Sequence, residues 1–349
     1  MNKTSAIRKP ISIGVLTTGI VLMVGALIID ITGIKFGARG AMLIIGLLAA
    51  LYGLYRFPSQ KYHRGIVYFI FLFPLVFAFA VTVIIPLVLG VGYSFTDWTG
   101  IKITKFVGLA NYSSMFHDPA FLWSVLITFL FVILNIIMVN LIGFALALLC
   151  TSAIKGTGFF RAAYFLPNLI GGIVLGYIWQ FVFNNVLIQM TKTSFLANTE
   201  TAMLGIIIVY IWQYAGYIML IYITGLTQVP KDVIEAASID GANSKQVLFH
   251  VRIPLIMPTI TICTFLTLTS AFKQFDVNMA LTNGTGSVDG FLGGYLANGT
   301  QMLALNIYNT AISKNSYAVG QAKAVLFFII LAAVSLIQVR TMNSKEVEL

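Results

Sequence analysis

Long runs of apolar residues, separated by short polar segments, make up most of the sequence. Runs such as Gly65 to Gly90 and Ala202 to Gly225 are apolar on nearly every helical face. A helix needs about 20 such residues to cross about 30 Å of hydrocarbon. Strands of a membrane barrel would instead alternate polar and apolar residues over about ten positions. The pattern therefore predicts an all-α integral membrane protein.

We predict about eight transmembrane helices. They form an N-terminal helix pair in residues 1–60 and a core of six spans in residues 61–345. The predicted spans are 11–33, 40–57, 65–90, 121–150, 160–185, 202–226, 253–275 and 322–340.

Composition and charge agree with a membrane location. The chain has 349 residues, of which 59% are hydrophobic and 9% charged, too little polar surface for a soluble globule of this size. The net charge of +10 would suggest a nucleic-acid partner in a soluble protein, but here the basic residues lie mostly in short loops. Their distribution favours a multi-pass protein of the cytoplasmic membrane with both termini in the cytoplasm and no nucleic-acid partner.

Three connections between spans differ from the rest. Residues 93–119 and 276–321 are long and polar, and we expect them to be external loops with short helices. Residues 228–252 should lie inside and form a short amphipathic helix, a turn at Gly241 and a second short helix. A solvated loop is the alternative for this last segment. Its length favours contact with a partner protein.

The sequence contains no pattern for nucleotide hydrolysis or other catalysis. It lacks a Gly-x-x-x-x-Gly-Lys-Ser/Thr phosphate loop, and its three histidines are far apart. Cys150 and Cys263 have no metal-ligand spacing. We therefore expect a non-catalytic subunit with no metal and no cofactor of its own. A secondary transporter, an alternative class, would carry ionisable residues near several span centres, and this chain has almost none.

Polar and aromatic residues near two spans suggest a sugar site. Trp212 to Tyr217 supplies aromatic rings and an amide, and Lys273, Gln274, Asp276 and Asn278 follow a later span. Sugars bind aromatic faces through their C–H surfaces, and amides bridge their hydroxyl groups. Lys273 could pair with Asp276 or contact an acidic group of the substrate, and we favour the pairing.

Other polar or small residues within spans have two interpretations each. Asn135, Asn140 and Asn168 fit hydrogen bonding between helices and ligand contact equally well. Gly172 to Gly176 has small residues four apart, a spacing that favours close helix packing.

One segment resembles a known family. Glu235-Ala-Ala-Ser-Ile-Asp-Gly241, followed by Ile253-Pro-Leu-Ile-Met-Pro258, resembles the EAA loop of permeases from binding-protein-dependent ABC importers. Phe160-Arg-Ala-Ala-Tyr-Phe-Leu-Pro167 is similar to the start of a core span in the same permeases. The similarity covers roughly residues 65–345 and is best with the larger permease of maltose-type and multiple-sugar importers. Two departures are the missing Gly-Gly-Pro in the loop near Gly286 and the additional N-terminal helix pair.

The resemblance implies partners and site residues. The partners would be a second homologous permease, two ATPase subunits that bind ATP and magnesium, and an extracytoplasmic solute-binding protein, and the substrate would be a sugar or oligosaccharide. Import of glycerol phosphate or of an acidic oligosaccharide by the same machinery is the alternative. The residues expected to dock on the ATPase are Glu235, Ala236, Ala237, Asp240 and Gly241. The candidate substrate-binding residues are Asn168, Gly172, Tyr214, Tyr217, Lys273, Gln274 and Asn278.

Overall fold

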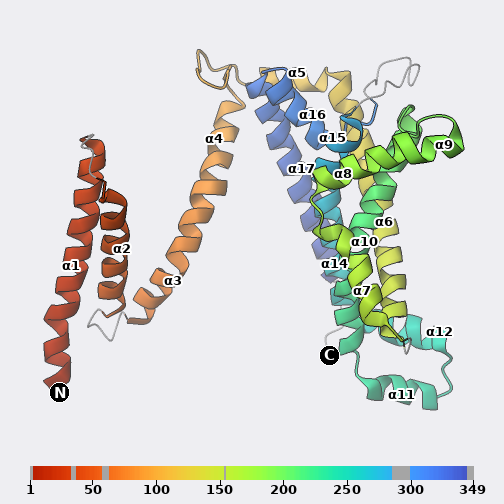
Figure 1. Cartoon of the computed structure of the whole chain (residues 1–349), viewed down its shortest axis with the longest axis horizontal. Coiled ribbons are helices and arrows are strands. Elements are labelled where there is room, and N and C mark those ends of the chain that lie inside the picture. The colour runs from red at the N-terminus through yellow and green to blue at the C-terminus, as the bar shows by residue number, and fades with distance from the viewer. Residues whose placement is uncertain (1–2, 33–36, 57–62, 153–154, 285–298, 344–349) are drawn as a thin grey trace. The chain divides into compact units, whose positions relative to one another are not determined.

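The computed structural model describes residues 3–32, 37–56, 63–152, 155–284 and 299–343. Within these ranges the chain consists of helices, turns and one isolated β-bridge between Thr96 and Phe106, so the all-α prediction is confirmed. The chain divides into two compact units, Met1–Leu89 and Gly90–Leu349 (Figure 1). The predicted functional division at residue 60 is a different boundary and stays a prediction.

The first unit is built around two helices packed closely through glycine. It comprises α1 (Lys3–Ile31), α2 (Arg39–Tyr55), α3 (His63–Phe79), the π-helical turn η1 (Ala80–Ile84) and the start of α4 (Ile85–Tyr93). A side chain at Gly53 would collide with the backbone of Leu16, which explains how α1 and α2 approach so closely. Asp30 and Arg39 form an ion pair of 2.7 Å between the end of α1 and the start of α2.

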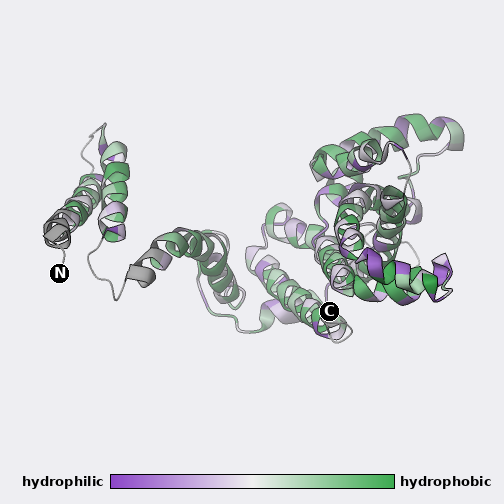
Figure 2. Cartoon of the chain, turned by 90° about the horizontal axis from the view of Figure 1, so that it is seen from below, coloured by the Kyte–Doolittle hydropathy of each residue, from purple (hydrophilic) through white to green (hydrophobic). Residues whose placement is uncertain are grey.

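The second unit packs around two long helices, α6 and α10. The rings of Phe131 and Tyr210 meet edge to face at 5.1 Å between these helices, and both side chains are fully buried. Many large apolar side chains of the long helices are exposed. Figure 2 shows that hydrophobic residues predominate along these helices. The helices are α5 (Ala110–Phe116), α6 (Pro119–Thr151), α7 (Thr157–Leu169), α8 (Gly172–Phe181), η2 (Val182–Leu187), α9 (Ile188–Thr191), α10 (Thr199–Gln228), α11 (Lys231–Ile239), α12 (Ser244–Gln246), η3 (Val247–Arg252), α13 (Ile253–Leu255), α14 (Met257–Phe272), α15 (Asp276–Thr282), α16 (Leu303–Tyr308), η5 (Asn309–Ser313) and α17 (Tyr317–Asn343).

The apolar helices match the predicted spans. Six described helices are long and apolar enough to cross a membrane. The helical pieces Ser244–Leu255 and Met257–Phe272, which meet at an angle of 71°, are together long and apolar enough to count as a seventh candidate span. The apolar helix α2 is shorter, at 17 residues, and accounts for the remaining predicted segment.

Two predicted spans are interrupted, although their hydropathy predicts continuous helices. The segment predicted at 160–185 breaks at Ile170, where an extended backbone (φ −82°, ψ 128°) separates α7 from α8. The segment predicted at 253–275 bends at Ile256, which lies between Pro254 and Pro258. Proline lacks the backbone N–H of a regular helix and its ring clashes with the preceding turn, so the two prolines account for this bend.

Candidate functional site

The proposed docking segment, α11, projects from one end of the second unit (Figure 1). The short helices α5, α15 and α16 lie at the opposite end, as expected for loops on opposite sides of a membrane. Glu235, Ala236, Asp240 and Gly241 are exposed, and Ala237 is half-buried. Ile234 on the inner side packs against the main hydrophobic core. This arrangement anchors α11 from within and leaves its outer surface open.

Gly241 ends α11 in a backbone conformation that suits glycine. Its φ is +88°, which places it in the left-handed region. The N–H of Ala242 donates to the carbonyl of Ala237 at 3.0 Å, and the N–H of Gly241 donates to that of Ser238 at 3.2 Å. These two bonds form a Schellman motif and satisfy carbonyls that the helix leaves open. The predicted helix and glycine turn are therefore present.

A capping box starts the second short helix of the segment. The Asn243 side chain accepts a hydrogen bond from the Gln246 backbone N–H at 2.9 Å, and the Gln246 side chain accepts one from the Asn243 N–H at 2.8 Å. Helices α12, η3 and α13 then continue to the bend at Ile256. The segment is thus structured throughout and joins directly to an apolar helix, whereas its contact with a partner protein stays a prediction.

Several candidate substrate residues meet where the α7–α8 break faces α10 and α15. A side chain at Gly172 would lie 2.6 Å from the Asp276 Cβ, and one at Gly176 would lie 2.6 Å from the Ala280 Cβ. The close packing expected for these two glycines is confirmed. The Gln213 amide donates to the carbonyl of Ile170 at 3.4 Å and ties α10 to the break. Gly172 is therefore required by packing as well as being next to the candidate site.

Two tyrosines of α10 border the same region. The rings of Tyr210 and Tyr214 stack with centroids 4.4 Å apart. Tyr210 is fully buried, whereas Tyr214 and Tyr217 are half-buried. Helix α10, which carries Tyr214, also contacts α15. The structure therefore brings Gly172, Tyr214 and the start of α15 together.

Gln274, at the end of α14, carries an amide that the protein does not satisfy. The side chain is only 6% exposed, and its Nε2 makes no hydrogen bond. Most buried polar groups have partners, and leaving one unpaired costs about 1–3 kcal/mol. The unpaired amide beside α15 keeps Gln274 a candidate for a hydrogen bond to a ligand.

Two other candidates are placed differently. Asn278 is fully buried, and its amide donates to the carbonyl of Thr300 at 2.8 Å and accepts from the Met302 N–H at 3.1 Å. Its side chain thus holds residues 300–302 against α15. Lys273 is exposed, and the two ion pairs found among described residues do not include it, so the favoured pairing with Asp276 is wrong.

The three asparagines within the apolar helices differ in their hydrogen-bond partners. Asn140 accepts a hydrogen bond from the Tyr222 hydroxyl at 2.9 Å and donates to the Thr267 hydroxyl at 3.3 Å, linking α6, α10 and α14. The interhelical interpretation holds for this residue. The Asn135 amide donates to its own helix at Phe131. Asn168 is half-buried in the last turn of α7, close in sequence to the break.

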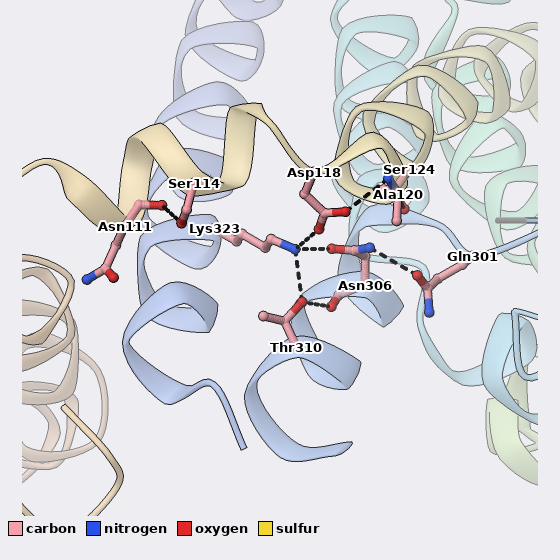
Figure 3. A network of polar contacts seen from close by, with 9 residues as sticks. All are labelled: Asn111, Ser114, Asp118, Ala120, Ser124, Gln301, Asn306, Thr310 and Lys323. Atoms are coloured by element: carbon pink, nitrogen blue, oxygen red, sulfur yellow. Dashed lines mark hydrogen bonds and ion pairs between the residues drawn. The ribbon is translucent and has the colours of Figure 1, made fainter. Parts of the chain in front are cut away.

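Sequence reasoning missed a buried cation at the opposite end from α11. Lys323 of α17 is 1% exposed, and its ammonium lies 2.9 Å from each of three oxygens (Figure 3). These belong to the carboxylate of Asp118, the amide of Asn306 and the hydroxyl of Thr310. The available signal was a lysine inside an apolar span, which requires a partner.

Comparison with known proteins identifies the family. Residues 119–344 match the family of binding-protein-dependent transport system inner membrane components. The chain belongs to this family. It is 42% identical to the probable starch degradation products transport system permease protein AmyD of Thermoanaerobacterium thermosulfurigenes, over 83% of this chain and 99% of that protein. It is 32% identical to the multiple sugar-binding transport system permease protein MsmF of Streptococcus mutans serotype c, over 75% of this chain and 90% of that protein.

Structural comparison gives the same fold. A crystal structure of a bacterial ABC transporter involved in the import of the acidic polysaccharide alginate contains a chain that superposes with a TM-score of 0.68. The match covers 82% of this chain and 98% of that one, at 16% sequence identity. The permease fold predicted from the EAA resemblance is confirmed, and the chain is a multi-pass membrane subunit of a transport system.

Proposed function

We propose that this chain is the permease subunit of an ATP-driven importer for sugars or oligosaccharides, with α-glucan fragments from starch as the first substrate class to test. The orphan amide of Gln274, which lies between α14 and α15, two helices that contact α10, is the observation that carries the substrate class. It can bridge hydroxyl groups, and the rings of Tyr214 and Tyr217 can pack on sugar C–H faces. The name of the relative at 42% identity supports starch-derived oligosaccharides.

The exposed outer surface of α11 supports docking of a separate ATPase subunit. Glu235, Ala236 and Asp240 are available for docking, and Ile239 is 86% exposed at the end of the helix. The partners in this proposal are two ATPase subunits that bind ATP and magnesium, a second homologous permease and an extracytoplasmic solute-binding protein. The chain itself is proposed to have no enzymatic activity. Both termini are proposed to be cytoplasmic, together with α11.

Copurification followed by ATPase measurement in lipid tests this function. We expect the complex to copurify with the ATPase and to hydrolyse ATP faster when the binding protein delivers maltotriose or maltoheptaose. Glu235→Lys should weaken ATPase association because it reverses a charge offered to the partner. A complex that copurifies but responds to none of a panel of sugars would contradict the substrate class. A complex without ATPase would contradict the proposal as a whole.

An acidic oligosaccharide is the second candidate, and Lys273 is the observation that favours it. This cation is exposed at the end of α14, next to Gln274, and forms no ion pair within the described residues. Lys273→Met separates the candidates. It should leave uptake of neutral maltotriose intact and lower uptake of an oligouronate if the substrate is acidic.

A further inference from the structure

A polar cavity of about 570 Å³ lies where α15, α16 and η5 meet. This volume is within the range of small-molecule sites, and none of its lining residues is acidic. Four amide side chains, an aromatic ring and a lysine contribute to the lining, namely Asn283, Gln301, Asn306, Asn309, Tyr308 and Lys314. Helices α15 and α16 lie at the opposite end of the second unit from α11 (Figure 1).

The chemistry of the lining suits a hydroxyl-rich ring. Each amide offers two donors and an acceptor, the combination that sugar hydroxyls can use in either direction. Tyr308 is 37% exposed, so part of its ring is accessible to a flat C–H face. Lys314 is exposed at the rim and adds a further donor. The absence of carboxylates from the lining is compatible with neutral and acidic sugars alike.

The Lys323 network holds two residues of the cavity lining by hydrogen bonds. Lys323 donates to Asn306 and Thr310, both of which line the cavity, at 2.9 Å each (Figure 3). Because the Asn306 oxygen accepts from the ammonium, its NH2 group faces the other way and donates to the Gln301 amide oxygen at 3.0 Å. The buried cation therefore sets the orientation of two successive amides. Such preorganisation lowers the entropic cost of binding.

The cavity adjoins the candidate substrate site. The Tyr308 ring packs on the ring of Phe275 with centroids 5.2 Å apart, and Phe275 directly follows Gln274. Met279, on the same short helix as Asp276, also lines the cavity. One side of α15 thus faces the cavity, while Asp276 at its start faces Gly172.

We propose that this cavity is an outer sugar subsite, which holds one ring of an oligosaccharide next to Gln274. The proposal rests on the proposed function and adds Tyr308 and Asn309 to the residues that contact substrate. Tyr308 packs on a ring face, and Asn309 bridges hydroxyl groups. An oligosaccharide long enough to reach both sites would gain affinity over a short one.

Site-directed labelling tests occupancy directly. Ser313 lines the cavity and is exposed, whereas Ser114 on α5 is exposed outside it. Ser313→Cys and Ser114→Cys are labelled with an impermeant maleimide in the assembled transporter, where the native Cys150 and Cys263 are buried. Millimolar maltoheptaose, without binding protein, should slow labelling at position 313 at least about threefold and leave position 114 unchanged. Equal rates at position 313 with and without sugar would overturn the subsite.

The labelling assay also separates sugar from protein as occupant. If unliganded binding protein slows labelling at position 313 and maltoheptaose does not, the cavity is a protein contact and the proposal is wrong. Sorbitol at the same osmolality serves as the control for solution effects, and protection by sorbitol equal to that by maltoheptaose would also overturn it.

Transport measurements give an independent test. Tyr308→Ala should lower maltoheptaose uptake at limiting concentration by about fivefold, the equivalent of one lost aromatic contact, and affect maltotriose less. The matched control is Tyr177→Ala, which removes an exposed tyrosine of α8 outside the cavity. Wild-type uptake by Tyr308→Ala at both lengths would overturn the subsite alone. A wild-type transporter that imports neither sugar would overturn the proposed function and the subsite together.

Discussion

The ammonium of Lys323 lies 2.9 Å from the carboxylate of Asp118, 205 residues earlier in the chain. Asp118 has two roles, because its other oxygen accepts a hydrogen bond from the Ala120 N–H at 3.1 Å and caps α6. Lys323 is buried and Asp118 is 30% exposed at its side chain, so the cation depends on this partner more than the carboxylate does. The pair fixes the start of α6 to α17.

We predict that Asp118→Asn destabilises the protein, even though asparagine can still cap α6. The change leaves a buried cation without its counterion, at a cost on the order of 3 kcal/mol. Lys323→Met should cost less, and the double variant should be more stable than the sum of the single effects predicts. Thermal unfolding of the four proteins in the same detergent measures this coupling. Strict additivity would show that the ion pair contributes nothing.

The turn at Gly241 should tolerate asparagine better than valine. A side chain there would meet no atom within 4 Å, so the backbone φ of +88° alone decides the outcome. Asparagine enters the left-handed region with little cost, and a β-branched residue there is strongly disfavoured. We expect Gly241→Val to insert in the membrane and lose ATPase association, and Gly241→Asn to retain most of it. Copurification yields compare the two, and equal retention would show that the turn is not needed for docking.

Gln274→Met should separate stability from transport. Because the Nε2 group of Gln274 has no partner, replacing the amide should leave the unfolding midpoint unchanged or raise it. Uptake should fall, since a ligand hydrogen bond is lost. Gln180→Met is the matched control, because the Gln180 amide donates to the carbonyl of Leu281 at 3.1 Å and its loss should cost about 1 kcal/mol. Normal uptake by Gln274→Met would remove Gln274 from the site.

The two ends of the second unit should be accessible from opposite sides of the membrane. Ser244→Cys at the α11 end and Ser114→Cys on α5 are both exposed positions. An impermeant maleimide added to intact cells should label position 114 only, and opening the cells should expose position 244. Labelling of both positions from outside would contradict the proposed topology.

Acid should open the hairpin that precedes α5. The backbone N–H groups of Lys105 and Thr104 donate to the Asp97 carboxylate and hold its pKa below the usual value of 3.8. A lowered folded-state pKa means that the stabilisation is present above pH 3.8 and is lost as the pH falls through the lower value. Trp98, stacked on Tyr93 at 4.5 Å, reports this opening through its fluorescence.

The control for this prediction is Asp97→Asn, which cannot change charge. Its Trp98 signal should lack the acid transition that the wild-type protein shows below pH 3.8. Identical pH profiles for the two proteins would mean that the carboxylate does not hold the hairpin.

Hydropathy and the EAA resemblance predicted the spans, the docking helix and the glycine turn because these features are local in sequence. The bends at Ile170 and Ile256 were not predicted, since apolar content says nothing about the direction of a helix. Contacts between residues far apart in the sequence were not predicted either. Lys323 gave no sign that its partner was Asp118.

Neighbouring residues of similar chemistry could not be sorted from sequence either. Gln274 and Asn278 are four positions apart, yet the first has an unpaired amide and the second uses its amide to hold Thr300 and Met302. The expected pairing of Lys273 with Asp276 failed because Asp276 lies against Gly172, on the neighbouring helix α8. The burial of each side chain and the direction in which it points decide these roles, and both depend on the whole fold.

The length of α6 has a consequence for how the protein is made. Its 33 residues rise about 50 Å, more than the hydrocarbon layer, so the Asp118 end reaches the headgroup region. There the carboxylate can stay hydrated while the ribosome completes the remaining spans. Lys323 lies in the last helix of the described chain, and its contact with Asp118 can form only after that helix has been synthesised and inserted. Formation of this ion pair is therefore a late step of biogenesis, and it requires that α6 and α17 have already come together.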